Sequence, residues 1–324
     1  MWEDEGRRAV LPDLADEDAY AAVYRDAAVW LPAMRVICAR HGLDAGALEP
    51  APPGSHLVFW AGSDRLIKLF CRFWPDDAVS ERVALTALTG NPAIPTPQVI
   101  AEGELEGWLY LILEPLPGTP LNQVWEQVEA RDREALCETL GGVMAALHAV
   151  PTKGMEAIAV DWPAWLAERR AGFAAAQTER GATPEWIAAA LDYLDEMWAE
   201  VVQGRPVLLN ADITDEHVLL AQEDGRWRMT GLIDFGDAML GDALYEFTAP
   251  LAFIVQADVP LRRALCRGYG HLDAALKEGF FRKLAAMALL HQFADLPLYV
   301  KAAGDPPPPD FAALRQALWS APGA

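Results

Sequence analysis

Short apolar runs separated by turn-like inserts occupy the first third of the chain, a pattern typical of β-strands. His56–Trp60 and Arg65–Phe70 flank the sequence Ala-Gly-Ser-Asp, and Gln98–Ala101 and Trp108–Leu113 flank a Glu- and Gly-rich turn. Runs of this length between turn residues favour strands over helices. We therefore expect two strand pairs between residues 56 and 113.

Helical periodicity surrounds these strands. Residues 15–42 carry apolar side chains three and four positions apart, and Gly42 is a natural stop. Asp77–Leu88 predicts a second helix, and the prolines that follow it forbid a long extension. Residues 48–54 are rich in proline and predict a loop.

The pattern changes at Pro115–Pro120, beyond which helices dominate. Helices are predicted at Arg131–Ala149, Trp162–Ala176, Pro184–Val202 and near Leu276–Leu296. One β insertion interrupts them, with a strand at Val207–Asn210 and a hairpin formed by His217–Leu220 and Arg226–Ile233. Strands followed by helices indicate an α+β class with two lobes. We divide the chain into residues 1–114, of which 1–48 are a helical extension, and residues 115–324.

The balance of acidic and basic residues limits the classes of binding partner that we expect. The chain has 26 basic and 47 acidic residues, a formal net charge of −21. Because nucleic-acid binders carry a basic face, nucleic acid is not an expected partner. The acidic surface either serves solubility or attracts cationic ligands.

Cysteine spacing and the N-terminus indicate a cytoplasmic protein. The four cysteines are far apart and match neither a zinc pattern nor a disulfide framework, so we expect free thiols. The N-terminus lacks the basic-then-apolar order of a signal peptide. No uncharged stretch reaches the ~20 apolar residues of a membrane helix, so no membrane partner is expected.

The candidate chemistry lies in the β insertion. Asp212 follows one predicted strand, His217 begins the hairpin and Asp234 ends it. The two hairpin strands run out and back, so the three side chains should meet at one end. Phosphoryl transfer needs such a group, with one carboxylate to orient the attacking hydroxyl and further ligands to hold Mg²⁺ against a triphosphate.

These residues resemble the aminoglycoside-phosphotransferase family, whose members are distant relatives of protein kinases. The resemblance rests on Asp-x₄-His from Asp212, on Ile-Asp-Phe-Gly around Asp234 and on the following Gly-Asp, and it extends from about residue 50 to 250. Residues 233–246 are similar to hygromycin B phosphotransferases, and a histidine at position 217 to the macrolide phosphotransferase branch. The resemblance implies a bilobal protein-kinase-like fold. Its N-lobe would be an antiparallel sheet with helices, and its C-lobe mostly helical with the catalytic hairpin.

The same resemblance implies roles for individual residues. Asp212 would be the catalytic aspartate, and His217 and Asp234 would bind Mg²⁺. Lys68 would contact the α- and β-phosphates of ATP or GTP, and Glu81 would pair with it. Gly54 and Ser55 would belong to a loop that covers the phosphates, and Glu114 and Leu116 to a hinge whose backbone binds the base. Asp237 and Glu246 are expected near the substrate. Asp242 would be structural and cap a helix from Ala243.

Two positions depart from the family pattern. Asn210 stands where the family usually has histidine, and we expect its amide to support the neighbouring loop backbone. His217 stands where asparagine is commoner, and imidazole suits transition metals better than Mg²⁺, so the preference could shift to Mn²⁺.

Plainer interpretations stay open for each residue. Asp212 and Asp234 could be turn aspartates, His217 a core histidine, and Lys68 and Glu81 exposed residues. The favoured hypothesis is a small-molecule O-phosphotransferase that acts on a hydroxyl of an aminoglycoside-like or other small acceptor, cationic or not, with antibiotic resistance as one implied role. The alternatives are a nucleotide-binding pseudokinase that serves as a scaffold, and a kinase of a macrolide or an endogenous metabolite.

Overall fold

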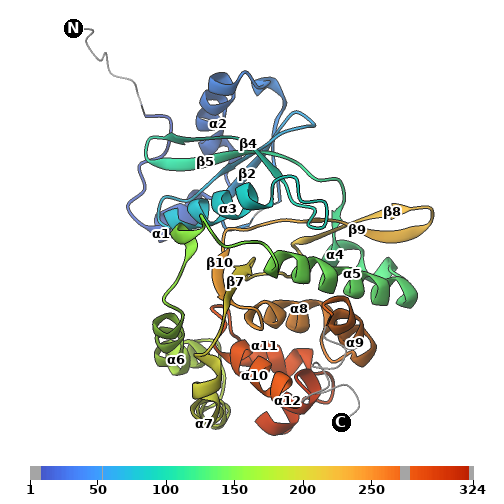
Figure 1. Cartoon of the computed structure of the whole chain (residues 1–324). Coiled ribbons are helices and arrows are strands. Elements are labelled where there is room, and N and C mark those ends of the chain that lie inside the picture. The colour runs from blue at the N-terminus through green and yellow to red at the C-terminus, as the bar shows by residue number, and fades with distance from the viewer. Residues whose placement is uncertain (1–8, 53, 271–277, 321–324) are drawn as a thin grey trace. The chain divides into compact units, whose positions relative to one another are not determined.

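The computed structural model describes residues 9–52, 54–270 and 278–320, which fall into two compact units (Figure 1). The first unit comprises Met1–Thr89 and Pro97–Leu116, and the second comprises Gly90–Thr96 and Pro117–Ala324. In the described part of the chain, no helix has the length and apolar character needed to cross a membrane.

The first unit is built on an antiparallel sheet of five strands in the order β1-β2-β3-β5-β4. The strands are β1 (Leu48–Pro50), β2 (Leu57–Ala61), β3 (Leu66–Leu69), β4 (Gln98–Leu105) and β5 (Trp108–Glu114). Both predicted strand pairs are confirmed. The predicted loop at 48–54 is wrong at its start, because Leu48–Pro50 pairs with β2 as an edge strand, where a proline is tolerated.

The predicted helix at 15–42 is two helices, α1 (Glu17–Val23) and α2 (Ala27–His41). Asp26 separates them, because its side chain accepts from the Ala28 N–H and caps α2. Gly42, at φ 68°, ends α2 in the left-handed conformation, as expected for a stop glycine.

The two faces of the sheet carry different helices. Ile67 and Leu69 of β3 point into a core that includes Trp30 and Met34 of α2. Because side chains alternate along a strand, Lys68 points to the opposite face. There it meets α3 (Pro75–Leu88). The alternation thus places one charged residue of an apolar strand against a helix.

The second unit is mostly helical. Its longer helices are α5 (Ala130–His148), α6 (Trp162–Glu179), α7 (Pro184–Val201), α9 (Val259–Gly268), α10 (Glu278–Leu289), α11 (Leu296–Ala302) and α12 (Phe311–Leu318). The predicted helices at 131–149, 162–176 and 184–202 are confirmed. The helix predicted near Leu276–Leu296 ends at Leu289, and residues 276 and 277 lie outside the described residues. The segment after Leu289 is therefore available for other contacts.

The predicted β insertion forms parts of two small sheets. β8 (Val218–Glu223) and β9 (Arg226–Leu232) form the predicted hairpin, and the short β6 (Thr119–Pro120) joins its edge. β7 (Pro206–Leu209) pairs antiparallel with β10 (Met239–Asp242), which the sequence did not indicate. The Leu209–Met239 pairing places the residues after β7 beside those that precede β10.

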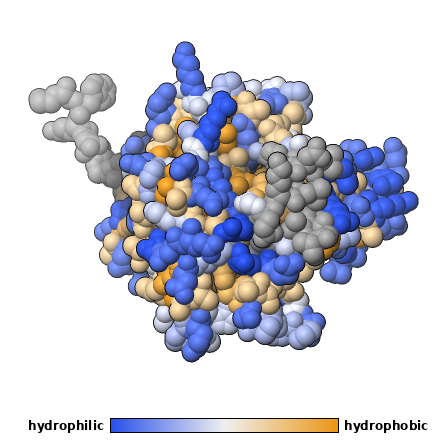
Figure 2. All heavy atoms as spheres, turned by 60° about the horizontal axis from the view of Figure 1, so that its bottom comes forward, coloured by the Kyte–Doolittle hydropathy of each residue, from blue (hydrophilic) through white to orange (hydrophobic). Residues whose placement is uncertain are grey.

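Together, the sheet-based first unit and the helical second unit with its hairpin confirm the α+β, kinase-like fold class. All four cysteines are free and buried, so packing rather than disulfides holds the described residues together. Hydrophobic residues on the face in Figure 2 occur in small groups among hydrophilic ones. The large hydrophobic side chains that are exposed, among those described, are Ile100 and Phe293.

Candidate active site

The hairpin brings together Asp212, the predicted catalytic residue, and the predicted metal ligands His217 and Asp234. His217 directly precedes β8, and Asp234 follows β9, whose end is tied back because the Ile233 N–H donates to the His217 carbonyl at 3.0 Å. The imidazole lies between the two carboxylates. Its Nδ1 is 3.6 Å from Asp212 Oδ2, and its Nε2 is 3.9 Å from Asp234 Oδ2. The expected cluster is confirmed.

Hydrogen bonding selects one tautomer of His217. Its Nδ1 lies 2.6 Å from the backbone carbonyl oxygen of Asp212. A carbonyl only accepts, so Nδ1 carries a proton, and in the neutral ring it is Nε2 that presents a lone pair toward Asp234. This is the arrangement in which a metal-ligating histidine is normally oriented by its other ring nitrogen.

The pair His217 and Asp234 suits a metal that other oxygens also bind. No group of three or more His, Cys, Asp or Glu side chains among the described residues is arranged to hold an ion. Mg²⁺ in kinases is commonly held by one or two protein ligands plus substrate phosphates. The Asp234 side chain is 40% exposed and the His217 side chain 17%, so a phosphate-bound ion could reach both.

Asn210 ties the two catalytic segments to each other. Its side-chain N–H donates to the Asp234 carbonyl at 2.6 Å, and its side-chain oxygen accepts from the Asp212 N–H at 3.1 Å. Asn210 is fully buried. The expectation that asparagine supports the loop backbone here is confirmed.

Ala211, between Asn210 and Asp212, has a φ of 68°, an uncommon conformation for a residue with a side chain. Two buried groups hold it there. The Glu246 carboxylate accepts from the Asn210 and Ala211 N–H groups at 2.8 and 2.9 Å, and His291 Nε2 donates to the Ala211 carbonyl at 2.9 Å. Burial lowers the pKa of His291 to about 4, so the imidazole is neutral and Nε2 can carry its single proton.

These contacts correct the expectation for Glu246. Its side chain is buried, and both carboxylate oxygens already accept backbone hydrogen bonds, so it holds the loop and does not face a substrate. His291 was not singled out as functional from the sequence. Its contact spans 80 positions in the chain, and no local pattern signals it.

Asp212 has the electrostatics of a proton acceptor. Burial raises its pKa to about 6, the Asp234 charge adds to the rise, and the His217 imidazole opposes it. A carboxylate with a pKa near neutrality accepts a proton more readily than an ordinary aspartate does.

The two aspartates that follow differ in their surroundings. Asp242 accepts from the Leu244 N–H at 2.9 Å and pairs with Lys283 at 2.8 Å, which confirms a structural role. It does not cap a helix from Ala243, because the next element is a 3₁₀ turn at Tyr245–Phe247 whose N-cap is Leu244. Asp237 is half-buried and accepts from Gln292 Nε2 at 2.7 Å, so its substrate role stays a prediction.

In the first unit, Lys68 and Glu81 form a buried ion pair. Lys68 Nζ lies 2.5 Å from Glu81 Oε2, and the two side chains are 7% and 3% exposed. The expected pairing is confirmed, and the alternative of two exposed residues is wrong. A buried charged pair is costly to desolvate, so its presence marks a candidate functional site.

Tyrosines of the N-terminal extension hold the expected phosphate loop. Tyr24 Oη accepts from the Gly54 N–H at 2.6 Å, and Tyr20 Oη donates to the Ser55 carbonyl at 3.0 Å. The sequence indicated only a helix here, because a tyrosine in an amphipathic helix normally signals packing. At the expected hinge, Glu114 ends β5 and Leu116 is the last residue of the first unit.

A sheet with a buried Lys–Glu pair, and a helical unit whose hairpin carries an aspartate, a histidine and a second aspartate, define a protein-kinase-like fold. Comparison with known sequences then identifies the family. Residues 48–282 match the profile of the phosphotransferase enzyme family, so the chain belongs to that family.

Individual relatives agree with this assignment. The viomycin phosphotransferase of Streptomyces vinaceus is 30% identical over 175 residues, which cover 51% of this chain and 58% of that protein. The chain thus matches somewhat more than half the length of this curated relative.

Two solved structures share the fold. The GDP complex of a mutant aminoglycoside 2'-phosphotransferase-IIIa has a TM-score of 0.65 at 17% identity, over 80% of this chain and 87% of that one. The ternary complex of APH(2'')-IIa with streptomycin and ATP has a TM-score of 0.58 at 13% identity, over 83% and 93%.

Proposed function

We propose that this protein is a small-molecule kinase that moves the γ-phosphoryl group of ATP or GTP to a hydroxyl of a small acceptor. The observation that carries the proposal is the arrangement of Asp212, His217 and Asp234. The lone pair of His217 Nε2 faces the Asp234 carboxylate at 3.9 Å, and Asp212 lies on the other side of the imidazole. Family membership supports the same activity.

The reaction forms one bond and breaks one. The acceptor oxygen bonds to the γ-phosphorus while the bond from that phosphorus to the β,γ-bridging oxygen breaks, and a nucleoside diphosphate leaves. Asp212 orients the hydroxyl and takes its proton, for which its raised pKa is suited. The Asn210 and Glu246 contacts keep the Asp212 backbone in place for this step.

His217 and Asp234 would hold Mg²⁺ or Mn²⁺ in this scheme. A bound divalent ion supplies neutralisation of the charge on the triphosphate. The chain itself contributes the orientation of the imidazole, through the Asp212 carbonyl, and the carboxylate of Asp234.

The nucleotide-binding residues belong to the first unit. Lys68, held by Glu81, would contact the phosphates, Gly54 and Ser55 would cover them, and the backbone of Glu114 and Leu116 would bind the base. We keep residues 1–114 as the nucleotide-binding domain and 115–324 as the catalytic and acceptor-binding domain. A cytoplasmic location accords with the use of a nucleoside triphosphate.

Antibiotics are the first acceptors to test. Relatives in the comparisons are named for viomycin and for aminoglycosides, and one was solved with streptomycin. Macrolides and endogenous metabolites belong in the same panel. If an antibiotic is the acceptor, expression of the protein in a sensitive host should raise tolerance to it.

A pseudokinase scaffold is the second candidate, because Asn210 and His217 depart from the family pattern. The intact Lys68–Glu81 pair and the raised pKa of Asp212 argue against it, since a scaffold needs neither.

A coupled nucleotide-turnover assay distinguishes the kinase from the pseudokinase scaffold. ATP or GTP, with Mg²⁺ or Mn²⁺, is offered with aminoglycosides, viomycin, macrolides and hydroxylated metabolites. Asp212→Asn should abolish acceptor-stimulated turnover, whereas Asp224→Asn, between β8 and β9 at the hairpin turn, should not. Nucleotide binding without turnover under any condition would support the scaffold, and no nucleotide binding would overturn the kinase proposal.

A further inference from the structure

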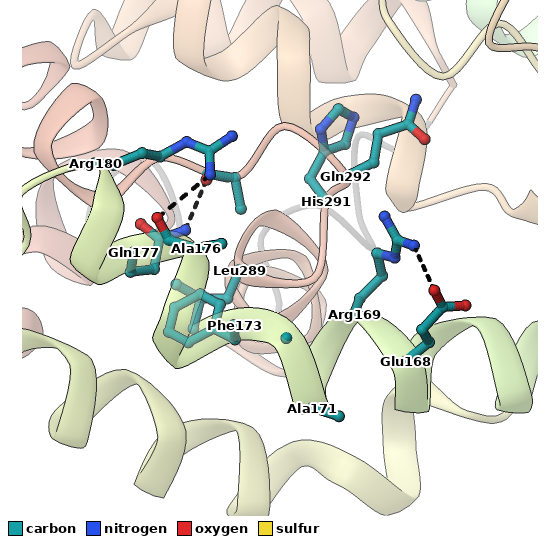
Figure 3. A pocket seen from close by; sticks show the side chains of 12 residues that line it. Glu168, Arg169, Ala171, Phe173, Ala176, Gln177, Arg180, Leu289, His291 and Gln292 are labelled. Atoms are coloured by element: carbon teal, nitrogen blue, oxygen red, sulfur yellow. Dashed lines mark hydrogen bonds and ion pairs between the residues drawn. The ribbon is translucent and has the colours of Figure 1, made fainter. Parts of the chain in front are cut away.

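A pocket in the second unit lies between α6 and the segment that follows α10 (Figure 3). Its volume is about 410 Å³. Its lining includes Glu168, Arg169, Phe173, Arg180, His291 and Gln292. A cavity of this size matches pockets that hold small-molecule ligands.

The pocket wall is bonded directly to both catalytic segments. His291 lines the pocket and donates to the carbonyl of Ala211, the residue before Asp212. Gln292 lines it as well and donates to Asp237, three positions after Asp234. A molecule in this pocket therefore lies against groups that position the reacting residues.

The charge of the pocket lining is opposite in sign to the net charge of the chain. The formal net charge of the whole chain is −21, whereas the charged residues of the lining are two arginines, Arg169 and Arg180, and one acid, Glu168. Both arginines come from α6 or its end, on either side of Phe173 (Figure 3). The apolar wall between them suits a carbon skeleton.

The two guanidinium groups are weakly partnered within the protein. Arg169 donates to Glu168 at 3.2 Å, but that carboxylate is 73% exposed, and Arg169 Nε is buried with no hydrogen-bond partner in the described residues. Arg180 makes a long 3.5 Å bond to the Ala176 carbonyl and lies 3.7 Å from Asp295. A guanidinium has five N–H donors, so most remain to bind a ligand.

One contact orients Arg169. Its Cζ lies 5.3 Å from the centre of the Trp165 ring, and Trp165 packs edge-on against Tyr245, which stacks on His291. Stacked guanidinium groups are held with little loss of hydrogen-bonding capacity. The aromatic residues thus connect the orientation of Arg169 to the same histidine that holds Ala211.

We propose that this pocket binds the acceptor and that the acceptor carries an oxyanion, a carboxylate or a phosphate, which Arg169 and Arg180 bind. This inference rests on the proposed kinase activity and refines its substrate class. Planar guanidinium groups recognise carboxylate and phosphate through paired, charge-assisted hydrogen bonds. The acceptor is then a hydroxylated acid, and not one of the cationic ligands that an acidic surface can attract.

Paired compounds test the acceptor class. D-gluconate is compared with sorbitol, and glycerol 3-phosphate with glycerol, so that each pair contrasts an anion with an uncharged polyol and the two pairs separate carboxylate from phosphate. Kanamycin and viomycin serve as cationic compounds. Binding is followed by thermal shift with nucleotide present, and turnover by the coupled assay. We expect at least one acid to bind and be phosphorylated, and its neutral partner to be weaker by tenfold or more.

Arginine variants test the contacts. Arg169→Gln and Arg180→Gln should each raise the KM of the acid roughly tenfold or more, since a hydrogen bond to a charged group contributes on the order of 1.5–3 kcal/mol. The KM of the nucleotide and kcat should stay within about twofold, because only uniform binding is lost. Arg170→Gln is the matched control, because Arg170 lies on the same helix but pairs with Asp195.

The outcomes are distinct. The inference is overturned if no acid binds or reacts while the wild-type protein binds nucleotide. It is overturned equally if a neutral or cationic acceptor is used with a KM unchanged by both arginine variants. A wild-type protein that binds no nucleotide would instead defeat the kinase proposal itself.

Discussion

The side-chain amide of Asn210 donates to the backbone carbonyl of Asp234 over 2.6 Å, so one buried residue ties the segment of Asp234 to the loop of Asp212. Its amide oxygen also accepts from the Asp212 N–H at 3.1 Å. The backbone positions of Asp212 and Asp234 thus both depend on the side chain of Asn210.

Replacement of Asn210 should therefore affect activity more than nucleotide binding. Asn210→Ala removes the hydrogen bonds to the Asp234 carbonyl and the Asp212 N–H, and loss of a buried hydrogen-bond partner costs about 1–3 kcal/mol. We expect a lower kcat, a nearly unchanged nucleotide KM and a reduced melting temperature. Asn210→His restores the family's usual residue and should recover most of the kcat. Equal kcat in Asn210→Ala and wild type would show that the tie is dispensable.

Breaking the Lys68–Glu81 pair should destabilise the first unit and weaken nucleotide binding. The pair is buried, and removal of one member of a buried ion pair costs about 3–5 kcal/mol. Glu81→Leu should lower the free energy of unfolding by about 3–5 kcal/mol. Lys68→Met should lower it by less in the Glu81→Leu background than in the wild type. Denaturant unfolding and nucleotide titration measure both effects. Additive single and double variants would contradict the pairing.

The metal preference should depend on His217. Its imidazole nitrogen favours Mn²⁺ relative to an amide oxygen, which suits Mg²⁺. His217→Asn should therefore raise the ratio of kcat/KM with Mg²⁺ to kcat/KM with Mn²⁺. The ratio rises roughly tenfold if the free-energy preference of the site for Mn²⁺ falls by about 1.4 kcal/mol. Activity measured across a titration of each ion tests this. A ratio unchanged from wild type would argue against His217 as a metal ligand.

Acid should destabilise the protein through His291. Its folded pKa of about 4 lies below the ordinary value of 6.5, so the unfolded chain binds the extra proton first as pH falls. Stability from this source is complete above pH 6.5 and decreases toward pH 4, by on the order of 3 kcal/mol in total.

The test compares wild type with His291→Gln in urea unfolding at several pH values. Because all other titrating groups are shared, the difference between the two pH profiles isolates the histidine. We expect the wild-type free energy of unfolding to fall more steeply between pH 6.5 and pH 4. Parallel profiles would mean that His291 is not buried in its neutral form.

Loss of one hydroxyl in the N-terminal extension should loosen the phosphate loop. Tyr24→Phe removes the oxygen that accepts from the Gly54 N–H, a bond that contributes about 1 kcal/mol. We expect the nucleotide KM to rise several-fold with the acceptor KM unchanged. Tyr193→Phe, which loses a comparable bond to Arg282 in the second unit, is the control. The same nucleotide KM in both variants would exclude a role for Tyr24 in this loop.

Local features of the sequence determined most of the elements and the catalytic group. The strand pairs at 56–70 and 98–113 and the hairpin at 217–233 follow from short-range periodicity and turn residues, which act over a few positions. Asp212, His217 and Asp234 could be placed together because a hairpin forces its two ends to meet. The pairing of Lys68 with Glu81 was expected from the family resemblance, because strand periodicity by itself also left an exposed lysine open.

Tertiary structure alone decided the supports of the site and the character of the acceptor pocket. Glu246, His291 and the Arg169–Arg180 pair owe their roles to contacts between segments that are far apart in the chain. The strand β10 and the early end of α10 depend likewise on what packs against them. Periodicity reports which face of an element is buried, but not which distant residue is buried against it, because that choice is made by packing of the whole unit.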